Sequence, residues 1–262
     1  MSRTKRQRLE STVAAIQRQH GARALQKGSE LPAQRRPPHV STSFAGLDAI
    51  TGCAGIPLGH VTLFTGPLGS GKLTVAYKVL MGAQQAVKKS KSAAPVAILS
   101  LNQQLHVDYI QRCAVDLTRL DIYQPPALEQ AVELLLYLAA GNVYRLILVD
   151  SVSDLLAMPP LARQFNRALS KLNRLLHATA SGLLCIGEES APWLARLLQW
   201  DQMAALRRAT ALHVDFGVQQ WLDRDGQWRG YRRLATVRKS RWAAAGACAQ
   251  IDIEFNGTVR AA

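Results

Sequence analysis

Short apolar runs alternate along this chain with longer segments whose apolar residues recur every three or four positions. The runs cover residues 61–65, 96–101, 121–123, 144–151 and 183–186. Nearly continuous apolar runs of this length are typical of strands buried in a parallel sheet. Helical spacing is found between them, in residues 73–85, 107–115, 128–140 and 161–180. Strands that alternate with helices predict an α/β fold with a mostly parallel central sheet flanked by helices.

The C-terminal part of the chain has a different pattern. Residues 211–216, 219–222, 232–238 and 250–255 have the composition of strands, with no helical spacing between them. Asp225-Gly226 is typical of a hairpin turn. This pattern predicts an antiparallel extension of the sheet.

The first 36 residues form a basic arm that contains nine Lys or Arg and two Glu. Residues 12–25 have the spacing of a short helix, and residues 34–39 are a link rich in Pro and Arg. The arm has too little apolar surface to form a core of its own. We therefore expect residues 1–39 to dock on a neighbouring molecule or to wrap nucleic acid, with a disordered tail as the alternative. Residues 40–262 are expected to form the folded core.

The most specific motif of the chain follows the first apolar run. It reads Gly66-Pro67-Leu68-Gly69-Ser70-Gly71-Lys72, followed by Leu73 and Thr74. Glycines allow a tight turn in which amide N–H groups point inward, and a helix N-terminus and Lys72 add positive charge. Between a strand and a helix, this motif predicts a phosphate-binding loop for a nucleoside triphosphate. A plain strand-to-helix turn is the alternative.

Two further positions concern a magnesium ion. The residue after the lysine of such a loop is usually Ser or Thr, whose hydroxyl ligates magnesium, but here it is Leu73. Thr74 lies about 100° further round the helix. Asp150 ends an apolar run, so its carboxylate is expected in the nucleotide crevice, where it can hold a magnesium-bound water. A helix N-cap is the alternative role of Asp150. We expect ATP binding, with Mg²⁺ where the site permits it, but no efficient hydrolysis.

The charge of the chain predicts a polyanionic partner. The net charge is +14, from 32 basic and 18 acidic residues, and such an excess favours nucleic acid. On the predicted helix 161–180, basic residues recur opposite the apolar face: they are Arg163, Arg167, Lys171 and Arg174. A stripe of this kind can lie along the phosphates of DNA. A solvated helix face is the alternative. A second basic stretch, residues 224–241, contains seven Lys or Arg and one Asp.

The composition limits the class of protein. The chain is 48% hydrophobic, which is typical of a globular protein. No apolar run is long enough to span a membrane, and the basic N-terminus lacks the apolar segment of a signal peptide. The four cysteines are scattered without a C-x-x-C pair, which favours buried or partly buried thiols in a reducing cytoplasm over a zinc site.

Taken in order, several segments resemble the bacterial RecA recombinase family across nearly the whole chain. They are S-T-S-F-A-G-L-D, G-I-P-L-G-H-V, G-P-L-G-S-G-K, Q-P-P-A-L-E-Q-A-V-E, L-I-L-V-D-S-V, V-R-K-S-R-W-A-A-A and Q-I-D-I-E-F. The resemblance implies a RecA-like P-loop core. It implies that residues 66–74 bind the nucleotide phosphates, that Asp150, beside Ser151, lies on the magnesium side, and that Tyr109 stacks on adenine.

The same resemblance implies contacts with other molecules. Lys239 and Arg241 match a pair that reaches the γ-phosphate held by a neighbouring subunit, and Arg163 matches an arginine that contacts DNA. The N-terminal helix matches one that docks on the next protomer. A homo-oligomer or a mixed filament, single-stranded DNA as the favoured partner and a cytoplasmic, nucleoid-associated location are therefore expected.

The departures from the family concern its chemistry. Asn102 falls where the family has its catalytic glutamate, Glu188 where it has a nucleotide-sensing glutamine, and His106 where it has an adenine-contacting aspartate. The first DNA loop is expected to be cut to a few residues around Met158-Pro159-Pro160, and the second loop, which starts Glu188-Glu189, lacks its glycines. No separate C-terminal domain is expected after Phe255. Asparagine can orient water but cannot take its proton.

This pattern resembles a smaller group, the RecA-like ImuA proteins, which accompany an error-prone polymerase in damage-induced mutagenesis. The resemblance implies a DNA-repair accessory protein of the SOS response that has an eroded nucleotide site and docks on RecA or a translesion polymerase. Two alternatives remain. One is an active DNA-dependent ATPase that forms recombination filaments on single-stranded DNA, and the other is a regulatory NTPase switch that does not bind DNA.

Overall fold

The computed structural model describes residues 3–21, 25, 36–88, 95–102, 105–188, 201–224, 227–254 and 259–261. The chain divides into two units, Met1–Arg36 and Pro37–Ala262. In the first unit, α1 spans Arg3–His20 and is followed by Gly21 at a φ of 92°. The prediction that this helix starts at residue 12 was wrong, because the polar residues before it are good helix formers without Gly or Pro.

The second unit is built on a sheet of nine strands in the part of the chain that the structure describes. From one edge to the other, the strands are β11 (Val259–Ala261), β10 (Cys248–Glu254), β9 (Gln227–Ser240), β8 (Leu212–Arg224), β3 (Val61–Thr65), β7 (Gly182–Ile186), β6 (Leu146–Asp150), β4 (Val96–Ser100) and β5 (Leu120–Tyr123). Pairing is parallel from β8 to β5 and antiparallel from β8 to β11. The predicted fold class is therefore confirmed. A small antiparallel pair, β1 (His39–Val40) and β2 (Ile56–Pro57), stands apart from this sheet.

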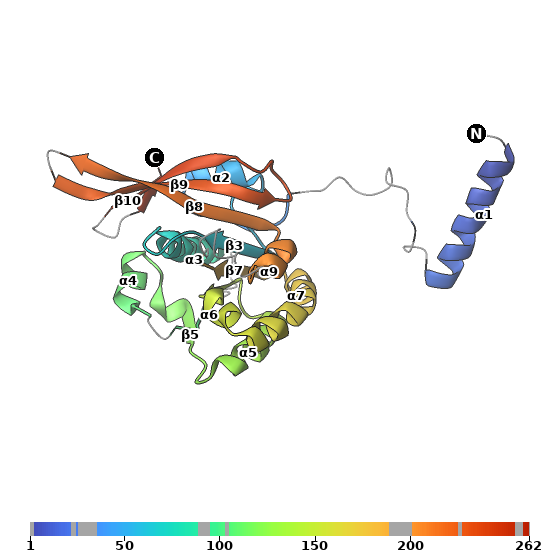
Figure 1. Cartoon of the computed structure of the whole chain (residues 1–262), viewed down its shortest axis with the longest axis horizontal. Coiled ribbons are helices and arrows are strands. Elements are labelled where there is room, and N and C mark those ends of the chain that lie inside the picture. The colour runs from blue at the N-terminus through green and yellow to red at the C-terminus, as the bar shows by residue number, and fades with distance from the viewer. Residues whose placement is uncertain are drawn as a thin grey trace. The chain divides into compact units, whose positions relative to one another are not determined.

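Helices cover both faces of the central parallel strands, which explains why β3, β4, β6 and β7 are mostly apolar and fully buried. The helices are α2 (Ala45–Thr51), α3 (Lys72–Lys88), α4 (Val107–Arg112), α5 (Ala131–Ala140), α6 (Val152–Ala157), α7 (Pro159–Thr179) and α9 (Ala204–Ala209), with 3-10 turns at Leu117–Arg119 and Leu128–Gln130. Alternate strand residues face opposite sides of a sheet. Phe64, Ile98 and Leu148 thus share a core with α3. Leu63, Leu99 and Ile147 share another with α5, α6 and α7. Figure 1 shows these last three helices gathered on the side away from the long strands β8, β9 and β10.

Three local expectations were corrected. The two strands expected at residues 211–216 and 219–222 are one strand, β8 (Leu212–Arg224), whose pairing with β9 shifts between Phe216 and Gln219. The segment around Met158 is not a loop: α6 precedes it, and Pro159 and Pro160 open α7, where a missing N–H costs nothing. Cys248 is exposed, unlike the other cysteines. The expected Asp225-Gly226 turn, Glu189 and Phe255 lie outside the described residues.

Within the described part of the chain, no helix combines the length and the apolar character that a membrane crossing requires.

Candidate nucleotide-binding site

The loop that follows β3 has the backbone geometry of an anion-binding turn. All five residues of β3 are buried, and α3 begins at Lys72. Gly66 has a φ of 148° and Gly71 has a φ of 78°. A Cβ on Gly66 would lie 2.6 Å from the carbonyl oxygen of Phe216, and one on Gly71 would collide with the side chain of Ile253. The positive φ angle favours glycine at both positions, and at Gly66 the carbonyl of Phe216 also leaves no room for a side chain.

A cavity of about 590 Å³ opens in front of this loop. Its walls bring together residues 68–74, from the loop and α3, with Asn102, His106, Tyr109, Asp150, Ser151 and Glu188, all of which the sequence had singled out. Ser153, Asp154, Ile186 and Tyr231 also line it. The cavity lies beyond the carboxyl ends of the parallel strands, which is where ligands of open α/β sheets bind.

Lys72 is buried at the centre of this cavity wall, with an exposed fraction of 6%. Its Nζ donates hydrogen bonds to the carbonyl oxygens of Gly66 and Pro67, both at 3.1 Å. A carboxylate oxygen of Glu188 lies 4.0 Å from the same Nζ. Burial lowers the pKa of Lys72, although Glu188 and Asp150 act in the opposite direction. The ammonium is thus held on the loop, where a phosphate oxygen can replace a carbonyl as its partner.

Asp150 ends β6 beside Ser100 of β4 and is 6% exposed. Burial raises its pKa to about 6, and the nearby charges of Asp154 and Glu188 add to this effect, while Lys72 opposes it. Asp154 itself accepts a hydrogen bond of 2.8 Å from the hydroxyl of Ser151. Three carboxylates thus line the cavity, but among the described residues no three His, Cys, Asp or Glu side chains form a group that could hold a metal ion.

The hydroxyl groups near Lys72 show which parts of a nucleotide complex the site fits. Ser70 Oγ is buried and has no hydrogen-bond partner among the described residues, so it can satisfy a phosphate oxygen. Leu73 has no hydroxyl, and the hydroxyl of Thr74 is hydrogen-bonded to that of Tyr109. The site thus fits the phosphates but lacks the hydroxyl ligand of magnesium. Asp150 remains able to hold the ion through water.

Tyr109 and Asn102 lie at the wall of the cavity formed by β4 and α4. The ring of Tyr109 packs edge-on against Tyr77 at 6.1 Å between centroids, and burial raises the pKa of its hydroxyl. Asn102 is exposed, and its Oδ1 accepts a hydrogen bond of 3.4 Å from Ser100. Its amide can orient a water molecule at this wall but cannot remove a proton from it.

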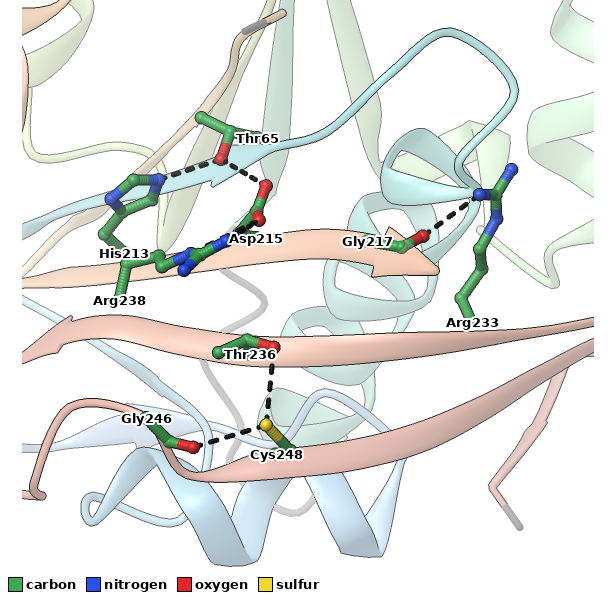
Figure 2. Close-up of polar contacts among 9 residues, drawn as sticks. All are labelled: Thr65, His213, Asp215, Gly217, Arg233, Thr236, Arg238, Gly246 and Cys248. Atoms are coloured by element: carbon green, nitrogen blue, oxygen red, sulfur yellow. Dashed lines mark hydrogen bonds and ion pairs between the residues drawn. The ribbon is translucent and has the colours of Figure 1, made fainter. Parts of the chain in front are cut away.

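Sequence reasoning missed Arg233, which reaches the loop from β9. One of its terminal nitrogens donates to the carbonyl of Gly69 at 3.0 Å, and the other donates to that of Gly217 at 3.1 Å. Figure 2 shows the second bond and the guanidinium directed from β9 toward the loop. The preceding residue, Arg232, faces the other side of the strand and pairs with Asp252 at 2.6 Å. Only strand parity, read with the correct register, could have separated the two arginines.

A buried polar cluster at the end of β3 was also not predicted. Thr65 Oγ1 bonds to His213 Nε2 at 2.9 Å and donates to Asp215 at 3.0 Å, and Arg238 pairs with Asp215 at 2.7 Å (Figure 2). A hydroxyl has one proton to donate, so Nε2 of His213 carries a proton and donates to Thr65. Burial, helped by Arg207, lowers the pKa of His213 to about 4. The cluster joins the phosphate-loop strand to the antiparallel strands.

Lys239 and Arg241 do not line the cavity of their own chain. Lys239 donates to the carbonyls of Arg207 and Arg208, at 2.9 and 2.8 Å, and so satisfies the end of α9. Arg241 is exposed. Their contact with a neighbouring subunit remains a prediction.

The basic residues of α7 form an exposed stripe. Arg163, Arg167, Lys171 and Arg174 are all exposed, whereas the opposite face buries Leu161, Phe165, Leu169, Leu172 and Leu176. No residue of α7 lines the nucleotide cavity. The stripe is therefore a separate surface, available to a phosphate backbone.

Comparison with known proteins identifies the family. Residues 7–181 match the RecA N-terminal domain family. Protein RecA of Nitratidesulfovibrio vulgaris strain DP4 is 30% identical over 196 residues, which cover 70% of this chain and 53% of that protein. Protein RecA of Thermus aquaticus is 29% identical over 200 residues, covering 72% and 57%. The chain belongs to the RecA family. It spans about half the length of the curated relatives that it matches.

Proposed function

We propose that this chain is a RecA-like accessory protein of DNA repair that binds a nucleotide, hydrolyses it slowly or not at all, and binds DNA. The observation that carries the proposal is the contrast within one cavity. The loop geometry, Lys72 and Ser70 are suited to phosphates, whereas Leu73 and Asn102 stand where the family's magnesium and water chemistry is expected. A site of this composition can respond to a nucleotide without consuming it rapidly.

Different residues of the cavity would bind different parts of the nucleotide. Residues 66–72 and the helix N-terminus would receive the phosphates, and Tyr109 would contact the base. Asp150 would hold a water of the Mg²⁺–ATP complex, whose metal would supply charge neutralisation at the phosphates. Asn102 would leave the attacking water without a general base, because an amide takes no proton at neutral pH.

DNA would bind to the basic stripe of α7. The four cations are exposed along one helix face. Each can neutralise a DNA phosphate and so release a counterion that was condensed on the DNA. We favour single-stranded DNA, in keeping with family membership. The net charge of +14 would further assist the encounter.

Family membership and the substituted nucleotide site together support a proposal about the wider role. We propose that the chain acts in the DNA-damage (SOS) response, of the ImuA type, docking on RecA or on an error-prone polymerase in the cytoplasm near the nucleoid. Residues 1–39, Lys239 and Arg241 would make the contacts with a neighbouring subunit in a homo-oligomer or a mixed filament.

The proposal is tested by measuring ATP turnover and single-stranded DNA binding on the same purified chain. We expect turnover near background with and without DNA, and DNA affinity that falls steeply as salt rises. Robust DNA-stimulated turnover that Lys72→Ala abolishes would instead establish an active DNA-dependent ATPase. Nucleotide binding without any salt-sensitive DNA binding would identify a regulatory NTPase switch.

A further inference from the structure

Arg233 is a buried cation that touches the phosphate loop from a strand outside the nucleotide motif. The residue is 6% exposed, and its guanidinium lies 5.2 Å from the centre of the Tyr231 ring, which itself lines the cavity. Its hydrogen bond to Gly69 fixes it against the loop. Arg233 does not itself line the cavity. Its guanidinium lies behind the loop, hydrogen-bonded to Gly69, and its charge acts on the ammonium of Lys72, so it influences the same phosphate position across the loop.

The charge of Arg233 is not balanced by a carboxylate in the described part of the chain. Its neighbours on β9 differ, because Arg232 pairs with Asp252 and Arg238 pairs with Asp215. Arg233 instead has two carbonyl partners, and its buried Nε has no partner among the described residues. Burying an unpaired charge is costly. A buried cation beside a phosphate-binding loop is stabilised when an anion binds there.

On the magnesium side, the cavity lacks hydroxyl ligands for the ion. Leu73 offers no ligand, and the hydroxyl of Thr74 is engaged by Tyr109. The divalent cation that normally neutralises the phosphates thus has weakened support in this chain, while an additional protein cation is present.

We propose that Arg233 is a second phosphate-site cation that, together with Lys72, neutralises a bound nucleoside diphosphate or triphosphate, so that binding depends little on a divalent metal. This inference rests on the nucleotide binding proposed above. It adds Arg233 to the residues that act on the nucleotide, and it specifies that the nucleotide can bind without a metal ion. It also gives the antiparallel extension a direct part in the nucleotide site, because β9 delivers the guanidinium.

The test measures the affinity of the full chain for ADP and for ATP by calorimetry, in excess magnesium chloride and in excess EDTA. For the wild-type chain we expect less than about a threefold difference between the two conditions, and for Arg233→Gln about a tenfold loss of affinity in EDTA. Arg233→Lys should retain part of the affinity because it keeps the charge. Arg232→Gln is the matched control, since its side chain pairs with Asp252 on the other face of β9.

Several outcomes would overturn the inference. They are a wild-type affinity that collapses in EDTA, no nucleotide binding in either condition, or an Arg233→Gln affinity equal to that of the wild type. The thermal transition without nucleotide shows whether Arg233→Gln folds. If it does not fold, Arg233→Lys is compared with wild type instead. The inference is then overturned if the two proteins have equal affinities in EDTA and the same ratio of affinities with and without magnesium. DNA binding is measured on the same samples. Its loss with metal-independent nucleotide binding intact would reject the proposed function but not the role of Arg233.

Discussion

The ammonium of Lys72 lies 4.0 Å from a carboxylate oxygen of Glu188, so the cation proposed to bind phosphate already faces an anion of its own chain. The backbone N–H of Glu188 donates to Ser153 Oγ at 2.8 Å, which anchors the residue at the edge of the cavity. A phosphate that approaches Lys72 must therefore overcome repulsion from this carboxylate. Its side chain is 44% exposed, so solvent weakens the effect without removing it.

Glu188→Gln should accordingly strengthen nucleotide binding. Removal of one partly screened negative charge predicts a gain in affinity of about threefold to tenfold, that is, about 1 kcal/mol. Titration with ADP measures it. Glu129→Gln, an exposed change outside the residues that line the cavity, is the control and should leave the affinity unchanged. Equal affinities for Glu188→Gln and wild type would show that the carboxylate does not reach the phosphate position.

Asp150 should make the folded chain less stable as pH rises through the acidic range. Its pKa is raised from the ordinary value of 3.8 to about 6, so the folded state holds the proton more tightly than the unfolded state. The stabilising effect of this proton is complete below pH 3.8 and is lost by about pH 6. Asp150→Asn should therefore raise the free energy of unfolding at neutral pH by on the order of 3 kcal/mol, and the gain should vanish in acid. Urea titrations at several pH values measure this, with the exposed Asp223→Asn as control. A gain independent of pH would contradict the argument.

His213 should have the opposite dependence. Burial lowers its pKa from 6.5 to about 4, so its neutral form stabilises the fold above pH 6.5, and this contribution is lost as pH falls toward 4. The size of the loss is on the order of 3 kcal/mol. His213→Asn should be less stable than wild type at neutral pH but lose less stability on acidification. Urea titrations at several pH values measure this. If the free energy of unfolding of the variant, plotted against pH, runs parallel to that of the wild type, His213 does not titrate within this range.

The stripe on α7 should contribute to DNA affinity by neutralising phosphates. Replacing Arg163, Arg167, Lys171 and Arg174 together by Gln should weaken single-stranded DNA binding. It should also reduce the slope of log affinity against log salt by about 0.7 for each phosphate that the variant no longer neutralises. Because the four side chains are exposed, the thermal transition should not move. Arg112→Gln, an exposed change on α4, is the control, and an unchanged slope in the stripe variant would leave α7 as a solvated face.

Restoring two missing groups tests whether the nucleotide site is merely eroded. Asn102→Glu supplies a general base, and Leu73→Thr supplies a hydroxyl beside Lys72. Together they should raise DNA-stimulated ATP turnover at least about tenfold in magnesium. The gain should disappear when Lys72→Ala is added. A double variant no faster than wild type, yet folded, would mean that the cavity differs from an active site by more than these residues.

The sequence predicted the parts of the molecule whose signal is local. The strands β3, β4, β6 and β7 were recognised because burial on both faces makes them mostly apolar. The tight turn between β3 and α3 was recognised because its glycines and lysine are close together in the sequence. In β8 the pattern was read as two strands, because the register shift around Gly217 interrupts the alternation.

The parts that were missed depend on which residues the fold brings together. Arg233 and Gly69 are 164 positions apart, and Thr65 and Asp215 are 150 apart. Within a basic stretch, nothing local distinguishes Arg233, which touches the loop, from Arg232, which does not. The engagement of Thr74 by Tyr109 likewise depends on the packing of α3 against α4. Pairing partners of this kind are fixed by tertiary packing, which residue spacing does not encode.

The position of β3 between β7 and β8 limits how this protein can be divided. The segment that matches the RecA N-terminal domain family stops at residue 181, whereas both strands hydrogen-bonded to β3 begin later, at Gly182 and Leu212. An excised fragment bounded by the family match would leave β3, whose five residues are all buried, with two open edges, and such edges pair with other chains. Expression of that fragment alone would yield aggregates rather than a folded domain that contains the candidate nucleotide site.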